Sequence, residues 1–173
     1  MNFFELIQTR RSVRAYTSQM VEPEKIEAIL SAAKAAPSAG NLQAYEILVV
    51  LDAATRRDLG HAALGQEFLA RAPVALVFFA HPNRSAAKYH QRGTVLYSVQ
   101  DATIACAYAQ LAATALGLGT VWVGAFDDDA VIKVLGTKAG WRPVAILPIG
   151  YSAESPAATP RRSLDDLVHH HDR

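Results

Sequence analysis

Helix-type and strand-type patterns of apolar residues alternate along the chain. Phe3, Leu6 and Ile7 recur with the i, i+3, i+4 spacing of a helix face and predict a short first helix. Pro23 suits the first turn of a second helix, which Pro37 ends. Runs of β-branched and other large apolar residues predict four strands, over residues 47–51, 74–80, 120–124 and 143–151.

Helical patterns occupy most of the chain between these strands. The longest runs over residues 95–116, where small apolar residues recur with helical spacing until Gly117 or Gly119. Its predicted buried stripe consists of Val99, Ala102, Ala105, Ala109, Ala112 and Leu116. Shorter or weaker patterns occupy residues 53–60, behind the capping residue Asp52, and residues 61–72, 82–92 and 127–136.

The composition indicates one compact domain. The 173 residues are 51% hydrophobic and 19% charged, which suffices for a core without a disulfide or metal. The formal net charge of +1 lacks the basic excess that nucleic-acid binding needs. The one cysteine, Cys106, excludes an internal disulfide, and its alanine neighbours favour a packed core thiol over a nucleophile.

The longest apolar run, residues 72–80, is far shorter than the roughly 20 residues of a membrane span, so we expect a cytoplasmic protein without membrane contact.

The common sequence signatures of catalysis are missing or incomplete. Gly117 and Gly119 begin a dinucleotide-binding pattern, but Trp122 occupies the position of its third glycine. No lysine follows a glycine, which excludes a P-loop, and no HExxH motif is present. Ser38 lacks a flanking glycine of the nucleophile elbow. We therefore predict neither a metal site nor a catalytic pair of side chains.

Two polar segments are candidate binding elements. Arg10, Arg11, Ser12 and Arg14 follow the first helix, where guanidinium groups and a hydroxyl can converge on one phosphate. A solvated surface is the alternative for such a basic run. The loop 37–43 combines turn residues, backbone donors and side-chain amides, which suits the polar edge of a flat heterocycle.

Six segments taken together resemble one known family. They are Arg10–Arg14, Pro37–Gln43, Ile47–Val50, Asp101–Leu118, Gly117–Asp127 and Ala145–Gly150. In this order they are similar to the nitroreductase family over nearly the whole chain. The resemblance implies an α+β fold, a three-layer sandwich with a mostly antiparallel central sheet flanked by helices. It also implies a homodimer with both sites at the interface, an FMN-binding domain over residues 1–151, and a C-terminal extension, residues 152–173, exchanged onto the partner subunit.

The resemblance implies roles for the arginine segment around a non-covalently bound FMN. Arg10, Arg11 and Ser12 match the residues that hold the ribityl phosphate. Arg14 matches the cation beside flavin N1 and O2, where a positive charge would stabilise the reduced flavin.

The loop 37–43 has a different implied position. Pro37, Ser38, Ala39 and Asn41 match the segment that reaches the flavin from the other subunit. Gln43 would line the substrate side of the same site.

The remaining implied contacts come from later in the chain. Gly124 and Ala125 match the turn whose backbone N–H groups face flavin N5 and O4. Arg161 matches a late arginine on the phosphate, with Arg162 as the second choice. Gln66 aligns only loosely with an amide that contacts the flavin in relatives.

The activity that the resemblance implies is an FMN-dependent oxidoreduction. NADPH or NADH would reduce the flavin by hydride transfer in a ping-pong reaction, and a nitroaromatic, quinone or similar electron-poor small molecule would then be reduced. Because the flavin carries this chemistry, no catalytic side chain is expected. A non-catalytic flavin-binding or regulatory protein, and an oxygen-activating or flavin-consuming relative, are the alternatives.

Several features depart from the family pattern or extend it. Ala44 and Tyr45 stand where the family often has Pro-Trp, which changes the expected pocket wall. The short connection between the second strand and the long helix predicts a reduced lid over the flavin. Arg84, Lys88 and Arg92 recur at i, i+4 and i+8, so they form either a receptor for a nicotinamide nucleotide phosphate or a solvated helix face.

Overall fold

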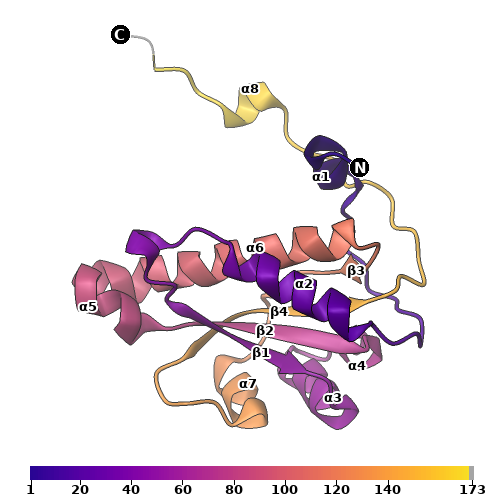
Figure 1. The fold of residues 1–173 in the computed structure, drawn as a ribbon, viewed down its shortest axis with the longest axis horizontal. Helices are drawn as coiled ribbons and strands as arrows, with labels where there is room; N and C mark the ends of the chain where they lie inside the picture. The colour runs from indigo at the N-terminus through magenta and orange to yellow at the C-terminus, as the bar shows by residue number, and fades with distance from the viewer. Residues whose placement is uncertain (172–173) are drawn as a thin grey trace.

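The computed structural model describes residues 1–171, and its central element is a four-stranded antiparallel sheet (Figure 1). The strand order is β1-β2-β4-β3. The strands are β1 (Tyr45–Val50), β2 (Val74–Ala80), β3 (Gly119–Thr120) and β4 (Arg142–Gly150). Because β2 is buried along its whole length, both faces of the sheet must be covered by other elements.

Helices cover both faces and complete a three-layer sandwich. In Figure 1, α2 and α6 lie on one face, and α3, α4 and α7 lie on the other. The helices are α1 (Phe3–Thr9), α2 (Pro23–Lys34), α3 (Ala53–Ala62), α4 (Phe68–Arg71), α5 (Pro82–Arg92), α6 (Ser98–Ala115), α7 (Asp128–Leu135) and α8 (Leu164–Leu167). The predicted α+β fold with an antiparallel sheet is therefore confirmed.

The hydrophobic core follows the two-residue alternation of the strands. Leu76 and Phe78 of β2 pack in the cluster that includes α2 and α6, whereas Val77 and Phe79 pack in the cluster that includes α3 and α7. All four side chains are fully buried. Each contributes roughly 1.5–3 kcal/mol by leaving water, so β2 holds the three layers together.

The third strand is shorter than the predicted 120–124. Only Gly119–Thr120 pairs regularly with β4, and Val123 then makes an isolated bridge to Ile146. The register is continuous between the two pairings, and it places Val121 opposite Pro148. Because proline has no N–H, the ladder hydrogen bond that would join them cannot form.

The long helix also differs from its prediction. A π-helical turn at Gly93–Tyr97 leads into α6, so the regular helix begins at Ser98 and not at residue 95. Of the predicted buried stripe, the three alanines in the middle are fully buried, whereas its other members, Val99, Ala112 and Leu116, are half-buried. Cys106 and Asp101 are buried as well, so the covered face is wider than the stripe.

Polar side chains cap the starts of α3 and α7, and Asp52 is the cap that the sequence predicts. The side chain of Asp52 accepts a hydrogen bond from the N–H of Thr55 at the start of α3, and Asp127 does the same at α7. Gly136 ends α7 with a φ of 58°, a conformation that favours glycine. The weak pattern over residues 61–72 holds only the last residues of α3 and the single turn α4.

The end of the chain leaves the sandwich. Residues after Tyr151 are mostly exposed, and Figure 1 shows α8 extending away from the layers. The last two residues of the predicted extension, 172–173, lie outside the described residues. Within residues 1–171, no helix has both the length and the apolar character that crossing a membrane requires.

Candidate functional site

The arginine segment, residues 10–14, lies along β3 at one edge of the sheet. The N–H of Val13 donates to the carbonyl of Thr120 (2.9 Å), and Ser12 pairs with Thr120 in a parallel bridge. The buried side chain of Val13 packs against Gly119, where a Cβ atom would come within 2.8 Å of it. Only a glycine permits this close approach, and it fixes the backbone of the segment.

Arg10 lies near Arg161, which comes from the opposite end of the chain. Burial and the positive charges of Arg161 and Arg11 lower the pKa of Arg10. Within residues 1–171, no ion pair joins any of these three arginines to a carboxylate. Guanidinium groups gathered without an acidic partner repel one another, and a bound phosphate would relieve this repulsion through charged hydrogen bonds. The donor set therefore fits a phosphate group.

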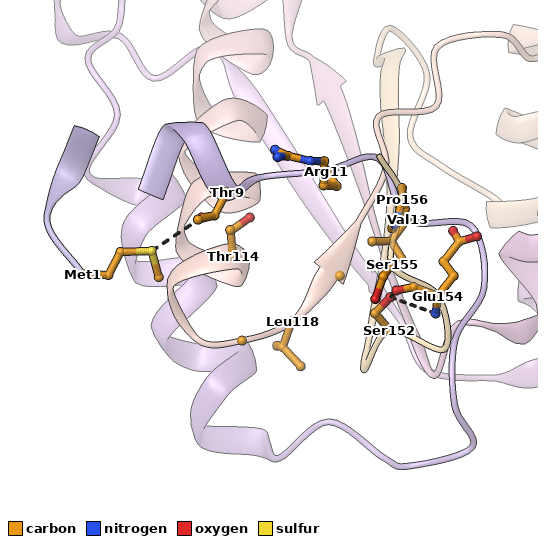
Figure 2. Close-up of a pocket in the computed structure, with 12 residues that line it drawn as sticks. Met1, Thr9, Arg11, Val13, Thr114, Leu118, Ser152, Glu154, Ser155 and Pro156 are labelled. Atoms are coloured by element: carbon orange, nitrogen blue, oxygen red, sulfur yellow. Dashed lines mark hydrogen bonds between the residues drawn. The ribbon is translucent and has the colours of Figure 1, made fainter. Parts of the chain in front are cut away.

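Arg11 is one of the residues that line a pocket of about 400 Å³ (Figure 2). The pocket lies between the arginine segment, the end of α6 and the start of the extension, and its lining includes Thr114, Leu118 and Glu154. The Arg11 guanidinium donates to the carbonyls of Gln8 (2.6 Å) and Arg10 (2.9 Å). Its hydrogen bonds thus stabilise the segment itself.

The start of the extension is fastened to the arginine segment. The carboxylate of Glu154 accepts hydrogen bonds from the N–H groups of Arg14 (2.5 Å) and Ala15 (3.1 Å). The N–H of Ala153 donates to the carbonyl of Ala15 (2.9 Å). These contacts guide the chain past the segment, and Arg161 follows seven residues after Glu154.

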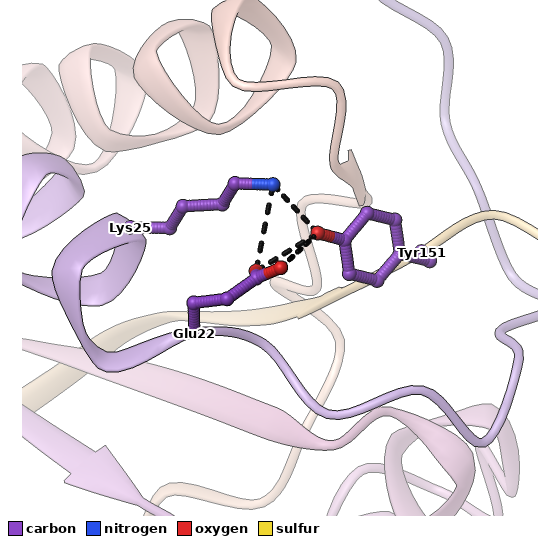
Figure 3. Close-up of polar contacts among 3 residues, drawn as sticks. All are labelled: Glu22, Lys25 and Tyr151. Atoms are coloured by element: carbon purple, nitrogen blue, oxygen red, sulfur yellow. Dashed lines mark hydrogen bonds and ion pairs between the residues drawn. The ribbon is translucent and has the colours of Figure 1, made fainter.

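A polar triad fixes the point where the extension begins (Figure 3). The Tyr151 hydroxyl donates to the Glu22 carboxylate (2.8 Å) and accepts from Lys25 Nζ (2.6 Å), while Lys25 and Glu22 form an ion pair at 3.4 Å. Hydrogen bonds from its own backbone N–H and from Tyr151 lower the pKa of Glu22. The hydrogen bond with Tyr151 raises the pKa of Lys25. The triad ties the start of α2 to the end of β4.

The turn at Gly124 and Ala125 follows the same edge of the sheet. Both residues are exposed, and within residues 1–171 their N–H groups donate to no protein acceptor. Gln66 Nε2 donates to the carbonyl of Ala125 (3.0 Å), which places this side chain at the turn. Four residues of extended chain from Thr120 to Gly124 span at most about 13 Å. One elongated molecule can therefore reach both the arginine segment and the turn.

The loop 37–43 lies elsewhere in the same chain. Its exposed residues Asn41 and Gln43 hydrogen-bond to each other, and the N–H of Gln43 donates to Ser38 Oγ (3.0 Å). The loop is bound to Asp101 of α6, whereas Arg11 lines a pocket with Thr114 of the same helix. Thirteen residues of helix separate these two points by about 20 Å. One chain thus does not bring the loop to the arginine segment.

The basic stripe on α5 is engaged by protein groups. Arg84 donates to the carbonyl of Gln43 (3.1 Å) and pairs with Glu46 (3.4 Å). Arg92 Nε donates to the Tyr97 hydroxyl (2.9 Å). Arg84, Lys88 and Arg92 are exposed, and because Arg84 and Arg92 already have protein partners, a solvated helix face is favoured over a phosphate receptor.

Cys106 is fully buried, and burial raises its pKa. A neutral, enclosed thiol is a core residue, as the sequence predicts. Within residues 1–171, no group of three or more His, Cys, Asp or Glu side chains is placed to hold a metal ion.

Comparison with known proteins identifies the family of the chain. The sequence model of the nitroreductase family matches residues 7–67 and 60–151. The chain belongs to the nitroreductase family. An NADH dehydrogenase of Thermus thermophilus is 33% identical, with 92% of this chain and 91% of the relative covered. An FMN reductase [NAD(P)H] of Bacillus subtilis is 32% identical, with 92% of this chain and 69% of the relative covered. The solved structure of NfrA2 from B. megaterium superposes with a TM-score of 0.91 at 31% identity, over all of this chain and 76% of that one.

Two further residues hold the candidate segments in place and are not among the site residues that the sequence predicts. Glu154 and Asp101 accept hydrogen bonds from the backbone of the two candidate segments; Asp101 begins one of the six segments that resemble the family, and Glu154 lies in none of them. The signal for Asp101 was its charge within the most apolar helix, because buried carboxylates need hydrogen-bond donors. No comparable signal marks Glu154, whose partners are distant in sequence.

Proposed function

We propose that this nitroreductase-family chain is an NAD(P)H-dependent FMN oxidoreductase that reduces nitroaromatics, quinones or similar electron-poor small molecules. The observation that carries the proposal is the placement of the arginine segment along β3, where Arg10 and Arg11 pair with no carboxylate among residues 1–171 and the nearby turn at Gly124 and Ala125 leaves its backbone N–H groups without a protein acceptor. The B. subtilis relative, named an FMN reductase [NAD(P)H], supports both the cofactor and the reductant. Because the reaction consumes NAD(P)H, we propose that it takes place in the cytoplasm.

In this proposal the edge of the sheet holds the cofactor. Arg10, Ser12 and Arg161 bind the phosphate of FMN, and Arg11 stiffens the segment through its hydrogen bonds to backbone carbonyls. Arg14 is exposed beside them and supplies a positive charge toward the flavin ring. The free N–H groups of Gly124 and Ala125 donate to the polar edge of the ring, and the missing side chain of Gly124 and the methyl group of Ala125 permit its approach.

The loop 37–43 completes the site from a second subunit. Pro37, Asn41 and Gln43 are exposed, so their side chains are available to a neighbouring chain, whereas the half-buried Ser38 and Ala39 fix the loop through hydrogen bonds within the chain. The separation of about 20 Å along α6 supports a homodimer, because a partner with α6 packed antiparallel can supply the loop that the chain itself does not. The domain 1–151 and the extension 152–173, packed on the partner, belong to the same proposal.

FMN, when bound, supplies the two-electron redox chemistry. The chain binds and orients the cofactor and leaves one side of it open to small molecules. No pair of catalytic side chains is required for this work, since binding and orientation provide the reactive geometry. The absence of such a pair also fits a flavin-binding protein without turnover, and the experiment below separates the two.

Replacement of both Arg10 and Arg14 by alanine tests the proposal. We expect the purified wild-type protein to absorb near 450 nm and to bleach anaerobically with NADPH or NADH, with recovery on addition of a quinone or nitroarene. The double variant should lose the bound flavin and loosen the dimer, because two charged contacts are removed from a site between subunits. Absorbance and size-exclusion chromatography measure both effects.

A matched double variant controls for loss of charge. Arg57→Ala with Arg71→Ala removes the same two positive charges from α3 and α4 and should retain the flavin. A wild-type protein that holds flavin but is bleached by neither nucleotide would favour the non-catalytic alternative. A colourless wild-type protein that does not take up added FMN would overturn the proposal.

A further inference from the structure

Asp101 is a buried carboxylate on the apolar helix α6. Only 1% of the surface of Asp101 is exposed. Oδ1 accepts a hydrogen bond from the N–H of Ala39 (2.9 Å), and Oδ2 accepts one from the N–H of Ala44 (3.2 Å). These two amides lie on either side of Asn41 and Gln43, the exposed amide side chains of the loop. One carboxylate thus holds the backbone on both sides of these two side chains.

The backbone of this loop adopts an unfavourable conformation. Gly40, Asn41 and Gln43 have φ values of 57°, 57° and 49°. These lie in the left-handed region, which residues other than glycine seldom adopt. Such conformations persist only where surrounding contacts fix them. Within the loop, the bond from Gln43 N–H to Ser38 Oγ contributes, and it joins neutral groups. The two bonds to Asp101 involve a charged acceptor and are the stronger ones.

We infer that Asp101 is a positioning residue for the flavin site that the loop enters on the partner subunit. It acts through the amides of Ala39 and Ala44 and touches neither cofactor nor substrate. The same helix carries the exposed residues Thr103 and Ala107 on its open face, so one element would both hold the loop and meet the partner. This inference rests on the proposed function, because it names the group that prepares the loop for FMN.

The variant Asp101→Asn tests the inference with little change of volume. Asparagine keeps one acceptor oxygen and turns an NH₂ group toward an N–H, so one of the two bonds is lost. We expect hydrogen exchange at Ala39 or Ala44 to accelerate at least tenfold. We also expect the FMN dissociation constant to rise about tenfold, equivalent to about 1.4 kcal/mol. The absorption spectrum and fluorescence quenching of the remaining bound flavin should change, because the loop no longer holds one conformation.

Cys106→Ala is the matched control. Cys106 is fully buried on the same helix and packs in the core beside α2, so its truncation lowers stability without removing a bond to the loop. It should leave FMN affinity and exchange at Ala39 and Ala44 unchanged. If FMN binding weakens in both variants in proportion to the drop in their melting temperatures, the role of Asp101 is merely structural and the inference is overturned.

A second measurement needs no variant. In FMN-free wild-type protein, the amides of Ala39 and Ala44 should already exchange at least tenfold slower than unprotected amides. Unprotected exchange at the amides of Ala39 and Ala44 would overturn the inference. This test remains valid even if Asp101→Asn does not fold. If wild-type protein binds FMN and Asp101→Asn binds it equally well, the inference alone fails. If wild-type protein binds no FMN, the proposed function fails, and the inference fails with it.

Discussion

At the scale of single residues, buried neighbours determine where the exposed candidate groups lie. The arginine segment follows β3 because Val13 is inserted against Gly119, and its start is held by the contacts of Arg11 with backbone carbonyls. Ser12 and Arg14 are held through their backbones, and within residues 1–171 their side chains make no hydrogen bond or ion pair. Small changes in the packing under the segment should therefore disturb binding without altering any binding side chain.

Gly119→Ala is the residue-scale prediction. The new Cβ would lie 2.8–3.0 Å from three side-chain atoms of Val13, so the segment must shift. We expect a loss of about 1–3 kcal/mol in the free energy of unfolding, as for other overpacked sites, and weaker FMN binding. Urea unfolding and an FMN titration measure the two. Adding Val13→Ala should restore part of the lost stability and part of the lost FMN affinity. If the double variant shows no recovery, the contact between the new Cβ and the Val13 side chain is not the cause.

At the scale of elements, the sequence patterns locate most helices and strands, and tertiary contacts decide their ends. The caps at Asp52 and Asp127 act locally and were predictable. The end of β3 depends on Pro148 in a strand that is distant in sequence, so no local pattern contains it. For the site, the arginine segment and the loop were visible as polar clusters. Glu154, which anchors the arginine segment, was not visible, because it binds backbone amides of a remote segment, and Asp101 stood out only as a charge within the most apolar helix.

Tyr151→Phe tests the tie between α2 and β4. The pKa of Glu22 is lowered in the folded protein, so its ionised form stabilises the fold above the ordinary glutamate pKa of about 4.3. This stabilisation is lost as the pH falls through the lowered folded pKa. We expect the variant to be less stable than wild type at pH 7 and the difference to narrow toward pH 3. Urea midpoints at several pH values measure it, and a constant difference would contradict the role of the charged carboxylate.

At the scale of the whole molecule, the arrangement of the candidate groups has a consequence for assembly. The sandwich places the arginine segment near the end of α6 and the loop 37–43 beside Asp101 near its beginning. Between them the open face of α6 carries Thr103 and Ala107, residues small enough for a second helix to approach closely. A two-fold axis across this face would bring each loop toward the partner's arginine segment. Dimerisation and flavin binding should then be lost together.

Ala107→Glu tests this coupling. A carboxylate buried without a partner at a helix–helix interface costs about 3 kcal/mol or more, which corresponds to at least a hundredfold weaker dimer. We expect the variant to elute as a monomer in size-exclusion chromatography and to lose FMN, although no cofactor contact is altered. Ala54→Glu introduces the same charge in the first turn of α3, on the opposite face of the sheet, where a helix N-terminus favours it. This control should remain a yellow dimer. A monomeric Ala107→Glu variant that keeps its flavin would show that each site is complete within one chain, since loss of the partner's loop would then leave binding intact.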